Sequence, residues 1–240
     1  LWESLVAEEA DDLQIVAAEI AAQVAADEPI TREAVSRAIA EASYPADIVD
    51  DIQVISPSGE MLYSNAAEID ERSLLDATTI GMITGRKTHL GGLRQANPDT
   101  YVVASAVPVF DGDDVVAIVV AAADAERVLG RFTGTLREPS YLVSLRGRLV
   151  EGTAPLLWKE VDPHIPPRTA DAQIIRTEDR LLLATGVPVP DMAGGTVGTL
   201  VTLRDSTEIL ETGETLQRSG LIAVATFTII VILGLYLYMR

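Results

Sequence analysis

The sequence predicts an α+β protein built from two similar units, each an antiparallel sheet with helices, followed by a membrane-spanning helix. Two observations carry this prediction. Residues 101–129 align with residues 181–210 in order, with a turn at the same position. Residues 219–239 contain no charged side chain, no amide side chain and no proline. A duplicated pattern of strands and turns favours a small sheet that occurs twice. An apolar stretch of that length favours a helix that crosses a bilayer.

The apolar stretch 219–239 has the length and the flanks of a membrane span. At about 1.5 Å per residue such a helix extends roughly 30 Å, the thickness of the hydrocarbon core. Arg218 and Arg240 are the flanking charges, and Tyr236 and Tyr238 lie near the far end, where interfacial aromatic residues are common. We expect the segment before the span to be a juxtamembrane helix that continues into it.

The composition excludes several classes of function. The 240 residues include 18 basic and 36 acidic side chains, which give a net charge of -18. Such a surface repels phosphate backbones, so we expect no nucleic acid partner. Cysteine is absent, which excludes disulfides and Cys-based metal sites. The length before the span suffices for two small domains. The expected segments are a helical region at 1–50, units at 51–133 and 134–205, the juxtamembrane helix at 206–218 and the span at 219–239.

The N-terminal residues predict two helices. In residues 1–27, apolar side chains recur at three- and four-residue steps with acids between them, which is typical of an amphipathic helix. The recurring residues are Leu13, Val16, Ile20 and Val24. Pro29 interrupts this pattern, and Thr31 is a suitable N-cap for a second helix that ends near residue 43. The apolar stripe of the first helix packs either on its own domain or on a second copy of the chain.

From residue 51 the pattern changes to strands. Two alternating runs joined at Ser58-Gly59 predict a hairpin over residues 51–64. Residues 68–79 predict a helical turn or two, and the Gly-, Asn- and Pro-rich residues 84–99 predict a loop. Two further strands, 100–110 and 114–124, are joined by a tight turn and lead into a short helix.

The second half of the chain repeats this order. The aligned segments share the run Val-Pro-Val and a terminal aspartate, and the hairpin sequence IQVISPSGEMLYS resembles SYLVSLRGRLVEG. Matched positions are Ser56 and Ser144, Gly59 and Gly147, and Asp124 and Asp205. We therefore expect a unit of hairpin, insert, hairpin and exit helix to occur twice. Each unit is a PAS-type sandwich of about five antiparallel strands, with one face covered by the insert and the preceding helix.

With its long first helix and terminal span, the chain resembles the double Cache family of extracytoplasmic sensor domains. The resemblance covers nearly the whole chain and is carried by DIQVISPSGEMLYSN, YVVASAVPVFDGDDVVAIVVAAAD and LLLATGVPVPD with VGTLVTLRD. It implies that residues 1–218 lie outside the cell membrane and that the membrane-distal first unit holds a small ligand. The implied output is a histidine kinase, a nucleotide cyclase or phosphodiesterase, or a chemotaxis rod, working as a homodimer. Amino acid binders of the family carry Arg-x-Trp-Tyr, whereas residues 93–101 have Arg94 and Tyr101 without the Trp-Tyr pair.

Basic residues gather in the first insert of this acidic chain. Arg86, Lys87, His89 and Arg94 lie within nine residues. As a functional site they would form the mouth of a pocket for a carboxylate or another anion, because an arginine offers a forked pair of donors. The alternative is a solvated loop whose charges balance the surface acids.

Three further residues are candidates for the ligand site. Tyr101 and Ser105 share one strand face and would supply hydrogen bonds in a pocket, or belong to the core. Asp124 ends a strand and would bind a ligand ammonium, or cap the following helix, as the equivalent Asp205 favours.

Enzymatic motifs are missing from the sequence. It contains two histidines and no H-E-x-x-H, G-x-S-x-G, P-loop or G-x-G-x-x-G run. Asp111, Asp113 and Asp114 lack the twelve-residue pattern of a Ca²⁺ loop. The sequence predicts no catalytic, metal or cofactor site, and a function as the ligand-sensing region of a transmembrane signal-transduction receptor. A membrane-anchored surface enzyme or adhesion domain is the alternative.

Overall fold

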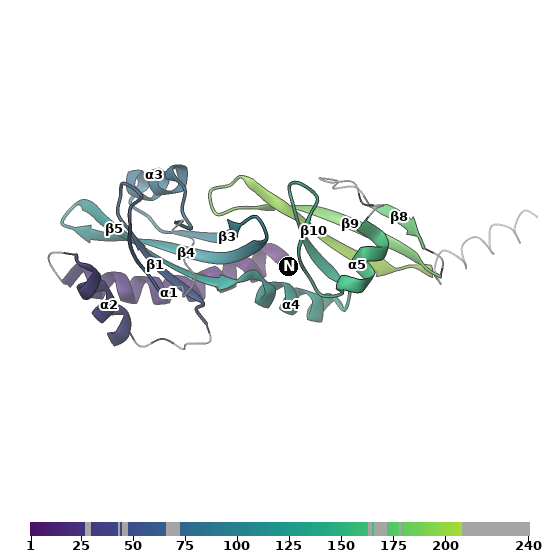
Figure 1. The fold of residues 1–240 in the computed structure, drawn as a ribbon, viewed down its shortest axis with the longest axis horizontal. Helices are drawn as coiled ribbons and strands as arrows, with labels where there is room; N and C mark the ends of the chain where they lie inside the picture. The colour runs from purple at the N-terminus through teal and green to yellow at the C-terminus, as the bar shows by residue number, and fades with distance from the viewer. Residues whose placement is uncertain are drawn as a thin grey trace, which may run out of the picture.

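The computed structural model describes residues 1–26, 30–42, 44, 48–65, 73–162, 165, 172–177 and 179–207. Within these ranges the chain forms two five-stranded antiparallel sheets, which lie one after the other along the long axis of the molecule (Figure 1). Their strand orders, β2-β1-β5-β4-β3 and β7-β6-β10-β9-β8, are one order repeated. The predicted α+β architecture of two like units with an N-terminal helix is confirmed.

The first sheet contains both predicted hairpins. Its strands are β1 (Asp51–Ile55), β2 (Met61–Ser64), β3 (Leu90–Asn97), β4 (Thr100–Asp111) and β5 (Asp114–Asp124). β1 pairs with β2 and with β5, and β4 pairs with β5 and with β3. The long β4–β5 hairpin is therefore the centre of the unit.

Helices cover both faces of this sheet. α1 (Trp2–Ala26) packs its apolar stripe on the face formed by Val103, Val119 and their alternate neighbours. α2 (Arg32–Glu41) follows, and its N-cap Thr31 accepts a hydrogen bond from the Ala34 amide. α3 (Ala77–Arg86) lies on the opposite face (Figure 1). The stripe of α1 thus packs on its own domain.

The expectation that the insert and the preceding helix share one face is wrong. β4 and β5 carry apolar side chains at consecutive positions, so each face of the sheet must be buried. α1 buries one face and α3 buries the other.

The second sheet follows the same plan. Its strands are β6 (Ser140–Ser144), β7 (Leu149–Gly152), β8 (Gln173–Arg176), β9 (Leu181–Pro190) and β10 (Thr196–Asp205). α4 (Ala125–Leu136) covers the face that contains Leu142 and Leu200, and α5 (Pro155–Val161) covers the other face through Trp158. α4 and α5 therefore correspond to α1 and α3.

The predicted loop over residues 84–99 is wrong, because this stretch contains the end of α3 and the whole of β3. The glycines of β3 serve close packing. A Cβ on Gly91 would lie 3.1 Å from the Ala10 Cβ of α1, and one on Gly92 would lie 3.3 Å from the Met192 Cα of the second unit. Gly92 also has a φ of 147°, which side chains rarely adopt. The helix expected over 68–79 begins at Ala77, and residues 66–72 lie outside the described part.

Except for residues 206 and 207, the predicted juxtamembrane helix and the predicted membrane span lie outside the described residues. Among the residues that are described, no helix combines the length and the apolar character that a membrane crossing requires. Residues 206–218 and 219–239 therefore stay predictions of the sequence.

Candidate functional site

One face of the first sheet brings charged side chains onto an apolar floor. We call this the α3 face: the side of β1, β3, β4 and β5 that lies under α3. Its floor includes Ala104 and Ala106 of β4 and Ala122 of β5, packed with Ile80 and Ile83 of α3. These five side chains are buried.

Arg94 stands at the β3 edge of the α3 face. It pairs with Val102 of β4, and its side chain is only 14% exposed. Its Nε donates to the Leu74 carbonyl at 2.9 Å, and its Nη2 donates to the Asp76 carboxylate at 2.8 Å. The remaining nitrogen, Nη1, lies 3.8 Å from an Asp191 oxygen, which leaves it outside hydrogen-bond range. Arg94 is therefore held in place by Leu74 and Asp76, and its Nη1 makes only a longer ion pair, with Asp191.

Asp76 joins this arginine to α3. It is the N-cap of α3, and its carboxylate accepts the Thr79 amide at 2.8 Å as well as the hydrogen bond from Arg94 Nη2. The hydrogen bond from Arg94, followed by that from the Thr79 amide, lowers the pKa of Asp76 to about 2. The start of α3 is thus tied to the edge of the sheet.

Carboxylates lie across the sheet from Arg94. Asp124 of β5 pairs with Val102, so it is two strands from Arg94, about 10 Å at the usual strand spacing. Asp51 of β1 pairs with Ala122 and accepts a hydrogen bond from Gln53 at 2.9 Å. Burial raises the pKa of Asp51, and its Oδ1 has no hydrogen-bond partner among the described residues. The α3 face therefore has a cation at one edge and acids toward the other.

Asp124 also has a structural role. It is the N-cap of α4, and its Oδ1 accepts the Glu126 amide at 2.8 Å. The equivalent Asp205 accepts the Thr207 amide at 3.0 Å in the second unit. The capping role that the repeat suggested for Asp124 is present in the structure, and its role in ligand binding stays a prediction.

The predicted basic cluster is divided between the two ends of α3. Arg86 is the last residue of α3, Lys87 is its left-handed C-cap with a φ of 54°, and His89 follows in an exposed connection. The Lys87 ammonium donates to the Asp113 carbonyl of the β4–β5 turn. Arg94 instead contacts the start of α3, about 15 Å away along a ten-residue helix. Arg94 and the other three therefore do not share one pocket mouth.

Tyr101 and Ser105 lie on the opposite face from Arg94. Both side chains are fully buried, and Tyr101 belongs to the apolar cluster under α1. The Tyr101 hydroxyl donates at 2.8 Å to the Val197 carbonyl, which belongs to the second unit. The Ser105 hydroxyl has no hydrogen-bond partner among the described residues. Tyr101 connects the two units and does not line the α3 face.

A turn of the second unit closes the β3 edge of the α3 face. In the β9–β10 turn, residues 191–195, the Met192 amide donates to the Leu93 carbonyl at 3.0 Å, and the Met192 side chain joins the apolar layer under α3. Asp191 holds the turn rigid, since its Oδ1 accepts the amides of Ala193 at 2.9 Å and Gly195 at 2.7 Å. A displacement of Arg94 or β3 would therefore displace this turn or break its hydrogen bond to Leu93.

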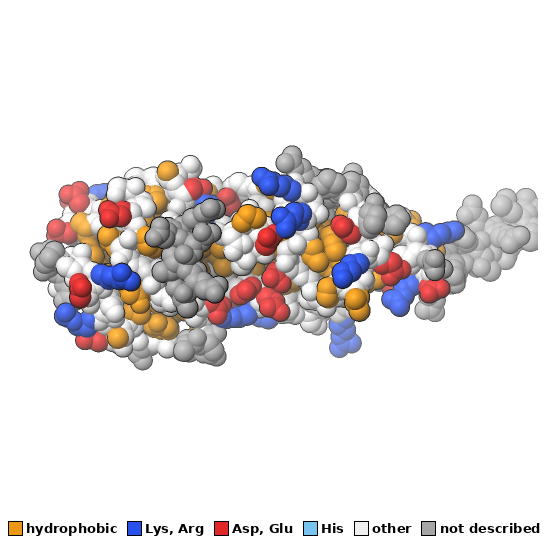
Figure 2. Space-filling view, viewed as in Figure 1, with side chains coloured by type: hydrophobic (Ala, Val, Ile, Leu, Met, Phe, Trp, Pro, Cys, Tyr) orange, Lys and Arg blue, Asp and Glu red, His pale blue; other side chains and the backbone are white. Residues whose placement is uncertain are grey.

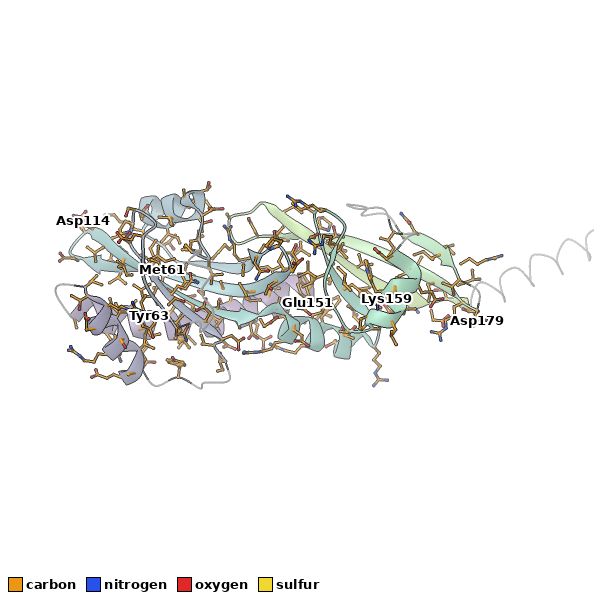
Figure 3. The ribbon with its side chains drawn as sticks, viewed as in Figure 1. Met61, Tyr63, Asp114, Glu151, Lys159 and Asp179 are labelled. Carbon is orange, nitrogen blue, oxygen red and sulfur yellow. The ribbon has the colours of Figure 1, made fainter. Side chains whose placement is uncertain are left out.

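A further interaction at the junction of the units is electrostatic. Glu151 lies on β7 of the second unit (Figure 3). Burial raises the pKa of Glu151, and the nearby acids Asp124 and Glu126 at the start of α4 raise it further. Ionisation of Glu151 is therefore unfavourable at this position.

Sequence reasoning missed Asp51, Gln53, Asp76 and Asp191. Asp76 had a local signal, because aspartate is one of the preferred N-cap residues. Asp51 and Gln53 are two residues apart in a strand, so their side chains are expected on the same face of the sheet. The strand pattern does not indicate which helix covers that face. Nothing local in the sequence predicts the approach of Asp191 to Arg94.

Comparisons with known proteins give structural likenesses. No family model matches the chain, and no curated protein matches it. One similar solved structure is the ligand-binding domain of the Pseudomonas aeruginosa PAO1 amino acid chemoreceptor PctC with GABA, at a TM-score of 0.49 and 10% identity over 85% of this chain and 94% of that one. The ligand-binding domain of PctB from the same organism, with L-Arg, has a TM-score of 0.48 and 13% identity over 86% and 96%. That of Campylobacter jejuni chemoreceptor Tlp3 with 4-methylisoleucine has 0.47 and 14% over 85% and 92%. At these TM-scores we take nothing about this chain's ligand from these proteins.

Proposed function

We propose that residues 1–207 belong to the extracytoplasmic sensing region of a transmembrane signal-transduction receptor. One observation carries the proposal: the β9–β10 turn of the second unit packs against the charged α3 face of the first. Strand β10, which begins at that turn, leads toward the predicted span at 219–239. A change on the α3 face therefore has a short physical route toward the membrane. The region itself performs no catalysis in this proposal.

The proposed ligand is a small molecule with an anionic group. The Nη1 nitrogen of Arg94 would bind that group, since an arginine pairs well with carboxylates. Asp124 and the unpaired oxygen of Asp51 would accept hydrogen bonds from a cationic or donor group of the same molecule. A ligand that fits one arrangement of α3, β3 and the turn better than another shifts the receptor toward that arrangement.

The test is a thermal-shift screen of small carboxylates and amines on the full 240-residue chain in detergent. A ligand at 100 times its Kd stabilises the folded state by about 2.7 kcal/mol. We expect Arg94→Gln to abolish the shift and Arg86→Gln, at the far end of α3, to leave it unchanged. A screen without any shift, or a shift that Arg94→Gln leaves intact, contradicts the proposed site.

The receptor role has its own test, which is the coding sequence that follows Arg240. A kinase, cyclase, phosphodiesterase or chemotaxis domain there supports a receptor. A stop codon supports the alternative of a membrane-anchored surface enzyme or adhesion domain. We also propose that the receptor is a homodimer, and sedimentation of the full chain in detergent would contradict this if it gave a monomer at all concentrations.

A further inference from the structure

A cleft lies at the junction of the two units, away from the α3 face. Its volume is about 430 Å³, within the usual range for small-molecule sites. One wall is the β3–β4 turn of the first unit, and the other is the β6–β7 turn of the second. The ends of these two hairpins approach each other in Figure 1, and Figure 2 shows basic side chains gathered near the middle of the molecule. Its polar lining residues are Gln95, Asn97, Ser144, Arg146 and Arg148.

The β1–β2 turn of the first unit shows whether the β6–β7 turn needs Arg146 and Arg148 for its backbone structure. In the β1–β2 turn, the Ser56 amide donates to the Glu60 carbonyl at 2.8 Å, and the Ser56 hydroxyl accepts the Glu60 amide at 3.0 Å. In the β6–β7 turn, Ser144 and Arg148 make the same two bonds at 2.8 and 3.1 Å. The backbone of this turn therefore forms equally well with Glu60 at the place of Arg148, and with Ser58 at the place of Arg146. The turn geometry does not require the two arginines.

The two arginines differ in their contacts. Arg148 forms an ion pair with Asp99 of the first unit at 2.7 Å, and both side chains are more than half exposed. For Arg146, the described residues provide no hydrogen bond or ion pair. The Asp99 carboxylate thus marks a position where a carboxylate binds at the cleft, and Arg146 is an open cation on the same turn.

The amides of the opposite wall complete the set of donors and acceptors. The Gln95 side-chain nitrogen donates to the Pro98 carbonyl at 3.2 Å, and the Asn97 side-chain oxygen accepts the Asp99 amide at 3.0 Å. These bonds hold the β3–β4 turn and leave the Asn97 nitrogen as a further donor. Two guanidinium groups and an amide donor facing one cleft suit an anion with several oxygen atoms.

We propose that this cleft is a second ligand site, which binds a small molecule with two or more carboxylate groups between Arg146 and Arg148. The ligand displaces Asp99 from Arg148 and contacts both units at once. Binding therefore depends on the relative position of the units. A ligand in the cleft would thus alter the contact that the β9–β10 turn makes with the first unit. The site is separate from the α3 face and stands whether or not Arg94 binds a ligand.

The experiment uses the full 240-residue chain in detergent at constant ionic strength, with succinate, citrate and inorganic phosphate as probes in calorimetric titrations. We expect succinate or citrate to bind, and Arg146→Gln to weaken binding about tenfold or more, as the loss of a charge-assisted pair predicts. Asp99→Asn should strengthen binding severalfold, because it removes the competing carboxylate. Lys159→Gln, which removes an exposed cation of α5 outside the cleft (Figure 3), is the matched control.

The outcomes separate this proposal from the one before it. Arg94→Gln should leave succinate and citrate binding unchanged, whereas it abolishes a ligand of the α3 face. Binding of phosphate alone, or no binding of any probe, overturns the proposal. So does an equal loss on Lys159→Gln, which would indicate a general charge effect, or weaker binding on Asp99→Asn.

Discussion

Replacing Tyr101 by phenylalanine tests how firmly the two units are joined. The Tyr101 hydroxyl is fully buried and donates at 2.8 Å to the Val197 carbonyl of the other unit. Val197 lies in β10 where the β9–β10 register shifts between Thr196 and Gly198. Leaving a buried carbonyl unsatisfied costs about 1–3 kcal/mol. At about 2–4 °C per kcal/mol for a protein of this size, the melting temperature should fall by roughly 2–12 °C.

The assay combines thermal unfolding with hydrogen exchange at the junction. Tyr141→Phe is the matched variant, since its hydroxyl is equally buried but donates at 3.0 Å to Ala154 within the second unit. Tyr63→Phe, at a partly buried position on β2 (Figure 3), controls for the loss of a hydroxyl. Both buried variants should lose stability, and Tyr101→Phe should be the one that speeds exchange at the junction. A Tyr101→Phe protein no less stable than the Tyr63→Phe control would contradict the stabilising role of the hydrogen bond to Val197.

Three further predictions concern the same contacts. Gly198→Ala should destabilise the folded state by about 1–3 kcal/mol in chemical unfolding, because the new Cβ would lie 2.6 Å from the Val143 carbonyl. A variant as stable as wild type would contradict this close packing. Asp76→Asn keeps the helix cap but loses the charge that pairs with Arg94. The pKa of Asp76 is about 2 in the folded state, against an ordinary 3.8. The stability that the Asp76 charge contributes is therefore present above pH 3.8 and is lost as the pH falls toward 2. We expect this variant to be less stable at pH 7 by under about 1 kcal/mol after solvent screening, with the difference gone near pH 2. Glu151→Gln should raise the melting temperature at pH 7 and much less at pH 4. The pKa of Glu151 is raised in the folded state, so the wild-type protein is more stable at low pH and loses that stability as the pH rises. Equal effects of the substitution at the two pH values would contradict this prediction.

Much of each unit could be predicted from local sequence. The alternating runs and the tight turns gave the hairpins β1–β2 and β4–β5, because period-two patterning and turn residues act within a few positions. The match of residues 101–129 to 181–210 gave the duplication, and the repeated aspartates indicated the cap at Asp124. The N-cap Thr31 was also predicted, since a cap depends on its own side chain and the next turn of helix.

What sequence reasoning missed depends on contacts between distant parts. Gly91 and Gly92 suggested a loop, yet they lie in a strand where α1 and the turn containing Met192 pack closely, so that an added Cβ would lie 3.1 and 3.3 Å from them. Tyr101 had the right neighbours for a pocket residue, but its partner is 96 positions away in the other unit. Arg86 and Arg94 are near in sequence, and a ten-residue helix and its connection separate their environments. No local pattern encodes such distances.

Hydrogen exchange on an Arg94→Gln variant tests most directly whether the α3 face and the second unit are coupled. The amide of Met192, which donates to Leu93, reports on the β9–β10 turn. We expect faster exchange at residues 191–195 as well as at the start of α3. Faster exchange confined to residues 74–79, with the turn unchanged, would contradict the coupling.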